Sequence, residues 1–174
     1  MSNTVAVAGL AAAAVMFVNG LATMNGQWAG VLNRPSWHPP GWLFGPVWSL
    51  LFVSIAAAAV IAWSGAANGT VRRRVLQLFA VNAFLNAFWS PLFFTARRPD
   101  WAAVELVLLW ISTLLLVVYL WRRVRRSSVL LLPYLAWVTI AFGLNVEIVR
   151  LNAPFGDLSD RAASAAAGTT TAKA

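Results

Sequence analysis

The sequence LVLLWISTLLLVVYLW, at residues 106–121, decides the fold class of this 174-residue chain. It carries no charged side chain, and it ends at the basic cluster RRVRR of residues 122–126. A helix crosses the hydrocarbon core of a bilayer with about 20 predominantly apolar residues. A charge at the centre of such a helix costs roughly 2.5–3.5 kcal/mol on insertion scales. The stretch therefore predicts a membrane-spanning helix that is followed by a basic connection.

Four further charge-free stretches share this pattern, at residues 1–33, 35–71, 75–96 and 127–146. Together with the first they predict five spans, at about residues 5–26, 42–64, 73–96, 101–122 and 129–150. Lipid offers no partner to a free backbone group, so each span must be helical. The expected fold is all-α: residues 1–152 form one bundle of five transmembrane helices. The Ala-, Ser- and Thr-rich tail of residues 153–174 is expected to be disordered.

Composition and charge place the chain in a membrane. Hydrophobic residues make up 60% of it and charged residues 10%, which is typical of a polytopic membrane protein. The formal net charge of +8 lies in short clusters between apolar stretches, so it indicates an orientation signal and not a nucleic-acid surface. The second and fourth connections carry seven arginines, against three in the first and third. The positive-inside rule then predicts a cytoplasmic N-terminus, with the lipid bilayer as a partner and no nucleic acid.

The residues that catalysis or metal binding needs are scarce. The chain has no Cys and a single histidine, His38, which cannot form a metal site alone. Glu105 and Glu147 are the acidic residues within the expected spans. Each is either an interfacial carboxylate paired with a nearby arginine or a proton or cation site. With no P-loop and no Ser/His/Asp set, the sequence argues against hydrolase or NTPase chemistry, and we assign no catalytic residue, no metal ligand and no obligatory cofactor.

Polar and aromatic side chains recur at helical spacing inside three of the expected spans. The second span carries Phe44, Trp48 and Phe52, the third Asn82, Asn86 and Trp89, and the fifth Tyr134, Trp137, Ala141 and Asn145. An amide in hydrocarbon needs a hydrogen-bond partner. That partner is either a neighbouring helix, in which case the amides hold the bundle together, or the polar edge of a ligand in a cavity. The sequence leaves both interpretations open.

The first connection carries an aromatic residue on a stiff backbone. It reads WHPPGW from residue 37 to residue 42. Pro39 and Pro40 fix their own φ angles, donate no backbone hydrogen bond and restrict the residues before them. Trp37 therefore lies on a rigid loop. We interpret Pro39 and Pro40 as the stiff part of a lid over a flat, apolar ligand.

Four sequence blocks resemble one membrane protein family. Residues 28–40, WAGVLNRPSWHPP, resemble the pattern W-Y-x-x-L-x-K-P-x-W-x-P-P of the translocator protein family (TspO/MBR), also called tryptophan-rich sensory proteins or peripheral-type benzodiazepine receptors. Phe44, Val47 and Trp48 follow at the family's F-x-x-V-W spacing. Residues 86–94, NAFWSPLFF, resemble its L-N-x-x-W…F-F block, and PYLAW at residues 133–137 with LN at residues 144–145 resembles its P-Y-L-x-W…L-N block.

The resemblance implies a five-helix membrane bundle, often a homodimer, with a pocket under the first loop. That pocket is implied to bind tetrapyrroles such as protoporphyrin IX and haem, and synthetic isoquinoline or benzodiazepine ligands. Matched to the motifs, the ligand-binding residues are Trp37, Phe44, Trp48, Asn86, Phe93, Trp137, Ala141 and Asn145. The chain departs from the family pattern at Ala29 and Phe52, where a Tyr is usual or frequent, and at Asn82, which replaces a common Gln.

Three functions remain open at this point. The first is a membrane protein that binds tetrapyrroles or similar hydrophobic ligands for sensing, sequestration or transport. The second is an enzyme that degrades porphyrin with light and oxygen, in which case the chemistry belongs to the ligand because the chain supplies no acid, base or metal. The third is a structural membrane scaffold whose aromatic residues serve packing alone.

Overall fold

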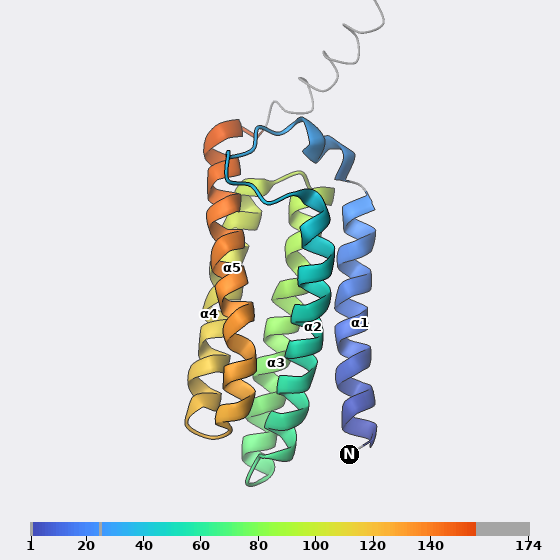
Figure 1. Cartoon of the computed structure of the whole chain (residues 1–174), viewed down its shortest axis with the longest axis vertical. Coiled ribbons are helices and arrows are strands. Elements are labelled where there is room, and N and C mark those ends of the chain that lie inside the picture. Colours follow the sequence, from blue (N-terminus) through green and yellow to red (C-terminus); the bar gives the residue numbers. More distant parts are fainter. Residues whose placement is uncertain (1, 25, 156–174) are drawn as a thin grey trace, which may run out of the picture.

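The structure is a computed structural model that describes residues 2–24 and 26–155. Its long helices are α1 (Ser2–Met24), α2 (Gly41–Ser64), α3 (Gly69–Ser90), α4 (Pro99–Trp121) and α5 (Arg125–Asn152) (Figure 1). Each of these five is long and apolar enough to cross a membrane, which confirms the predicted all-α, five-helix fold. The part of the predicted disordered tail from residue 156 onward lies outside the described residues.

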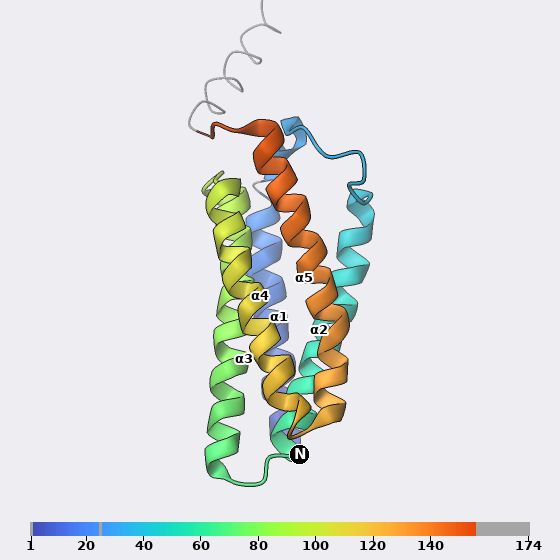
Figure 2. The same ribbon diagram turned by 90° about the vertical axis from the view of Figure 1, so that its left-hand side faces the viewer.

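The helices run up and down alternately and are joined by short connections at both ends of the bundle (Figures 1 and 2). α4 and α5 form the most extensive pair, and α2 and α3 pack beside them. α1 lies on the outside, against α2 and α3, and most of its side chains are exposed. Large apolar side chains such as Leu10 and Phe17 point outward, as lipid-facing residues do.

Three serine hydroxyls tie α5 to its neighbours near the end at which α5 begins. Ser127 donates to the carbonyl of Ala58 on α2, and Ser128 donates to the carbonyl of Val117 on α4, both at 2.7 Å. The third bond runs the other way, from Ser54 Oγ on α2 to the carbonyl of Leu130 on α5 at 2.7 Å. Such bonds satisfy polar groups where no water reaches them, and they fix the register of the helices.

A π-helical turn, η2 (Pro91–Thr95), continues α3 at its upper end. Pro91 has no N–H to donate into the α-helical ladder, and the turn widens so that the N–H of Ala96 donates to the carbonyl of Pro91 at 2.8 Å. The wide turn brings Phe93 into the bundle, where it is buried, and places Phe94 beside it with ring centres 4.9 Å apart. This aromatic pair forms part of the wall described next.

Candidate functional site: a cavity beneath the first loop

A cavity of about 620 Å³ lies beneath the first loop, between α1, α2, α3, η2 and α5. We call it the upper cavity. Seven of the eight sequence-predicted ligand residues line it: Phe44, Trp48, Asn86, Phe93, Trp137, Ala141 and Asn145. The helical spacings explain this arrangement, because residues four or seven apart share one face of a helix. A volume of this size is typical of small-molecule sites.

The structure places the eighth predicted residue, Trp37, outside the lining of the upper cavity. Its side chain is 51% exposed and lies over α5 at Gly143. Because Gly143 has no side chain, the ring comes close: a Cβ atom there would be 3.6 Å from Cη2 of Trp37. A ligand contact of Trp37 therefore stays a prediction, and in this structure the residue rests the loop against α5.

The loop is fastened at two points that the sequence did not indicate. The side chain of Asn152, at the end of α5, accepts from the backbone N–H of Asn33 and donates to the carbonyl of the same residue, both at 2.9 Å. The indole of Trp28, in the short helix η1 (Gly26–Val31), donates to the carbonyl of Phe94 at 2.9 Å. The loop is thus held to α5 on one side and to η2 on the other.

Aromatic rings form much of the cavity wall. Phe44 meets Trp137 edge to face, with ring centres 5.7 Å apart, and lies 5.6 Å from the ring of His38. On the opposite elements, Phe93 stacks on Trp89 at 5.1 Å. Aromatic faces of this kind can receive a flat, apolar ligand, and stacking adds about 0.5–1.5 kcal/mol to the burial of area.

Asn82, Asn86 and Tyr134 form a hydrogen-bonded ladder across the bundle. Asn86 donates to the hydroxyl of Tyr134 at 2.9 Å, and that hydroxyl donates to the side-chain oxygen of Asn82 at 3.3 Å. The amide nitrogen of Asn82 donates to Ser112 and Thr113 on α4, at 2.8 and 2.9 Å. Asn82 therefore joins helices. Asn86 does both: it bonds to α5, and it also lines the upper cavity.

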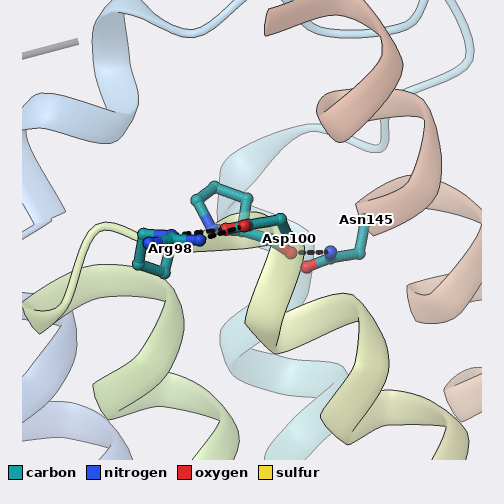
Figure 3. A network of polar contacts seen from close by, with 4 residues as sticks. Arg98, Asp100 and Asn145 are labelled. Atoms are coloured by element: carbon teal, nitrogen blue, oxygen red, sulfur yellow. Dashed lines mark hydrogen bonds and ion pairs between the residues drawn. The ribbon is translucent and has the colours of Figure 1, made fainter. Parts of the chain in front are cut away.

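The side-chain amide of Asn145 has a hydrogen-bond partner for its nitrogen but none for its oxygen. Its amide nitrogen donates to the carbonyl of Pro99 at 2.7 Å, which ties α5 to the start of α4 (Figure 3). Its side-chain oxygen is buried and has no hydrogen-bond partner. Asn145 is 2% exposed and lines the upper cavity.

Four side chains that line the upper cavity carry a buried polar atom without a partner. These atoms are the indole N–H groups of Trp89 and Trp137 and the side-chain oxygens of Asn19 and Asn145. A buried donor or acceptor without a hydrogen-bond partner costs about 1–3 kcal/mol of stability. The four residues line one cavity, but the atoms themselves are buried, so a contact to anything in the cavity requires their side chains to turn.

The two acidic residues in the spans have different environments. Glu147 pairs with Arg150 at 2.9 Å, as a local ion pair. For Glu105, the interpretation as a carboxylate paired with a nearby arginine is wrong. Arg98 pairs instead with Asp100, with Nε 2.8 Å from Oδ1 (Figure 3). Arg98 precedes α4, whereas the helix turns Glu105 inward, so that both of its carboxylate oxygens are buried without a partner. Glu105 does not line the upper cavity.

Charge and metal chemistry are sparse around the cavity. Arg34 in the loop is a cation in the lining, and its guanidinium also donates to the carbonyl of Ala29 at 3.3 Å. His38 lines the cavity too, with Nδ1 donating to the carbonyl of Pro39 at 2.6 Å. Within residues 2–24 and 26–155 there is no group of three or more His, Cys, Asp or Glu that could hold a metal ion.

The model of the TspO/MBR family matches residues 6–151 of the chain. The chain belongs to the TspO/MBR family. The tryptophan-rich protein TspO of Chlorobaculum tepidum is 42% identical over 122 residues, 70% of this chain and 77% of the relative. The protein of the same name from Archaeoglobus fulgidus is 37% identical over 147 residues, 83% of this chain and 94% of the relative. The human translocator protein is 35% identical over 127 residues, 72% of this chain and 75% of the relative.

As a TspO/MBR protein with five apolar helices, the chain is an integral, multi-pass membrane protein. Two of its departures from the family pattern lie in the cavity wall. Ala29 and Phe52 both line the upper cavity, at positions where the pattern often has a Tyr hydroxyl. At these two positions the lining therefore lacks the Tyr hydroxyl of the family pattern.

Proposed function

We propose that the upper cavity binds a tetrapyrrole, such as protoporphyrin IX or haem, for sensing, sequestration or transport. The observation that carries the proposal is a cavity wall rich in aromatic side chains, in which four residues also carry a buried, unpartnered polar atom. A tetrapyrrole is a flat apolar ring that carries both hydrogen-bond donors and acceptors. It can stack on the aromatic side chains of the wall.

The charges of the loop suit the acidic substituents of such a ligand. Arg34 lines the cavity, and the structure records no ion pair for it among the described residues. Porphyrin carboxylates at the loop side would therefore meet a cation, and the ring would lie deeper, between Phe44, Trp137 and Phe93. In this proposal Trp37, Pro39 and Pro40 act through the loop as a lid.

Cavity filling tests the proposal directly. Ala141 lines the upper cavity, whereas Ala136 on the same helix is exposed on its outer side. We expect protoporphyrin IX, titrated into the detergent-purified protein, to quench tryptophan fluorescence saturably. Ala141→Phe should abolish saturation and Ala136→Phe should not. Absence of saturable quenching in the wild-type protein would favour the scaffold function, whereas equal binding by the two variants would place the ligand outside this cavity.

Porphyrin degradation with light and oxygen is a second candidate, favoured by the three indole side chains in the wall, Trp48, Trp89 and Trp137. The bound ligand would absorb the light, and the lining would hold it next to oxidisable rings. Product analysis of the complex separates the two functions. A binding protein leaves protoporphyrin IX unchanged in light and in the dark, whereas a degrading protein converts it in light and oxygen, and Trp137→Phe lowers that rate.

We also propose a homodimer as the functional assembly, which the family resemblance implies. Large apolar side chains are exposed along the outer helix faces, among them the stacked pair Phe84 and Phe88 on α3, with ring centres 5.8 Å apart. Light scattering of the detergent complex, corrected for bound detergent, measures the protein mass. A mass of one chain would contradict the dimer.

A further inference from the structure

A second cavity, of about 470 Å³, lies between α1, α2 and α3, toward the end of the bundle at which α1 and α3 begin. We call it the lower cavity. Phe52 and Asn86 are the residues that line both cavities, so they form the partition between them. None of the other sequence-predicted ligand residues lines the lower cavity.

The lining of the lower cavity is almost entirely hydrocarbon. Small side chains leave the space, and they are Ala8, Ala11 and Ala12 on α1, Ala56 and Ala59 on α2, and Ala80 and Ala83 on α3. The polar groups at its inner end belong to Asn82, Asn86 and Tyr134, which bond to one another. A ligand deep in the lower cavity therefore finds apolar contacts and no free polar partner from this ladder.

The length of the lower cavity suits one acyl chain. Its lining on α1 extends from Asn3 to Val15, which is about 18 Å at 1.5 Å per residue. Half of a bilayer's hydrocarbon core is about 15 Å deep. A chain that occupies one leaflet therefore fits the cavity from end to end, alongside α1.

A positive charge lies beside one end of this cavity, outside its lining. Arg72, in the first turn of α3, is four residues before Leu76 and seven before Phe79, and both of those residues line the cavity. Its Cζ atom is 5.8 Å from the ring centre of Trp63, another lining residue. Among the described residues no acidic side chain pairs with Arg72. The apolar space thus lies beside a cation that has no acidic partner among the described residues.

We propose that the lower cavity is a second binding site, for a single-chain anionic amphiphile such as a long-chain fatty acid. Its hydrocarbon chain lies between α1, α2 and α3, and its carboxylate lies at Arg72. The site is separate from the upper cavity and does not depend on the tetrapyrrole proposal.

The head group must supply the selectivity of such a site. A lipid tail is as apolar as the cavity wall, so moving the chain out of a bilayer or micelle brings little hydrophobic gain. Filling the space restores van der Waals contacts for any chain of the right length. The charge at Arg72 is what distinguishes an acid from a neutral molecule with the same chain.

Photo-crosslinking tests this site. The probe is a long-chain fatty acid that carries a diazirine near the end of its chain, added to the detergent-purified full chain, with adducts located by mass spectrometry. We expect adducts on lower-cavity residues of α1, α2 and α3. We expect few with the corresponding neutral alcohol. Labelling by the alcohol at the same yield would overturn the role of the head group.

Two pairs of variants make the test specific. Arg72→Gln should reduce labelling up to about fivefold, the range that one exposed ion pair supports, whereas Arg74→Gln removes the same charge from the same turn on another face and should not. Ala56→Leu fills the cavity and should block labelling, whereas Ala57 is not in the lining and Ala57→Leu should not. Equal effects within either pair would contradict the site.

Competition experiments distinguish the fatty-acid site from the tetrapyrrole site and from a site for a two-chain lipid. Unlabelled fatty acid should displace the probe. Protoporphyrin IX should not displace it, and the same samples, titrated with protoporphyrin IX, report the upper cavity independently. Displacement by protoporphyrin IX would show one shared site, and displacement by phosphatidylglycerol as effective as that by the fatty acid would overturn the assignment to a single-chain ligand.

Discussion

The amide of Asn86 donates to the hydroxyl of Tyr134 at 2.9 Å, and this bond joins α3 to α5 where the two cavities meet. Tyr134 is fully buried, and its hydroxyl also donates to Asn82. The bond between these two residues holds the bundle together, and Asn86 also lines the upper cavity. Stability and ligand binding can therefore be separated by changing Tyr134 alone.

Tyr134→Phe should lower stability and spare the upper cavity. The change leaves a donor on Asn86 and an acceptor on Asn82 without their partner. Interhelical hydrogen bonds in membranes average about 0.6 kcal/mol, so we expect a fall of a few degrees in the melting temperature in detergent. Protoporphyrin IX affinity should stay within about threefold of wild type, since Tyr134 is not in the upper lining. Tyr119→Phe on α4 is the matched control and should change neither quantity.

The two tryptophans of the motif pair should differ in their effect on binding. Trp137 lines the upper cavity, whereas Trp37 lies over Gly143. Trp137→Ala loses both stacking and buried area, so protoporphyrin IX affinity should fall about tenfold or more. Trp37→Ala should lower the affinity less, because it only loosens the loop. Trp121→Ala, at the far end of α4, controls for general destabilisation. Equal losses at all three positions would mean that the aromatics act on the fold.

The fold could be predicted from the sequence because its determinants are local. A run without charges specifies a membrane helix whatever lies beside it, so the five helices follow from residues such as those at 106–121. The role of Asn82 could not be predicted, because its partners Ser112 and Thr113 are thirty residues away and their approach depends on how α3 packs on α4.

In the candidate site too, features set by local sequence could be predicted, and features set by contacts between distant residues could not. Helical spacing brings residues such as Phe44, Trp137 and Asn145 to one side of their helices, which is enough to gather them at one cavity. The orientation of Trp37 depends on a loop that is fixed by Asn152 and Asn33, 119 residues apart in the chain. No pattern in the sequence indicates this pair of hydrogen bonds, which we call the Asn152–Asn33 clamp. The geometry of the loop could therefore not be predicted from the sequence.

The distribution of the arginines predicts the orientation of the chain in the membrane. The start of α3 and the turn between α4 and α5 lie at the same end of the bundle (Figure 1), and seven arginines lie there, at residues 72–74, 122, 123, 125 and 126. We expect a cytoplasmic N-terminus by the positive-inside rule. Reporter fusions near Arg73 and Arg125 should both read cytoplasmic. Two periplasmic signals would reverse the orientation, whereas opposite signals would be incompatible with the five-helix bundle.

Removing the clamp should loosen the loop without moving the helices. Asn152→Ala deletes both bonds to Asn33, so amide hydrogens of residues 26–40 should exchange faster and protoporphyrin IX affinity should fall. Asn68→Ala removes an equivalent amide from the N-cap of α3, at the other end of the bundle, and should leave loop exchange unchanged. Unchanged exchange in Asn152→Ala would show that Trp28 alone holds the loop.

Stiffness of the loop is tested by replacing Pro39 and Pro40 together with Gly. Pro40 directly precedes α2, with φ of −54°, so the two prolines set the path by which the loop enters the helix. Glycine at both positions frees this path, and the loop must then be ordered when the ligand binds, which weakens protoporphyrin IX binding. Because Asn152 and Trp28 still hold the rest of the loop, we expect a smaller loss than for Trp137→Ala. Circular dichroism and gel filtration should match wild type. A folded double variant with wild-type affinity would count against a preorganised lid and leave the helix-borne aromatics as the determinants of binding.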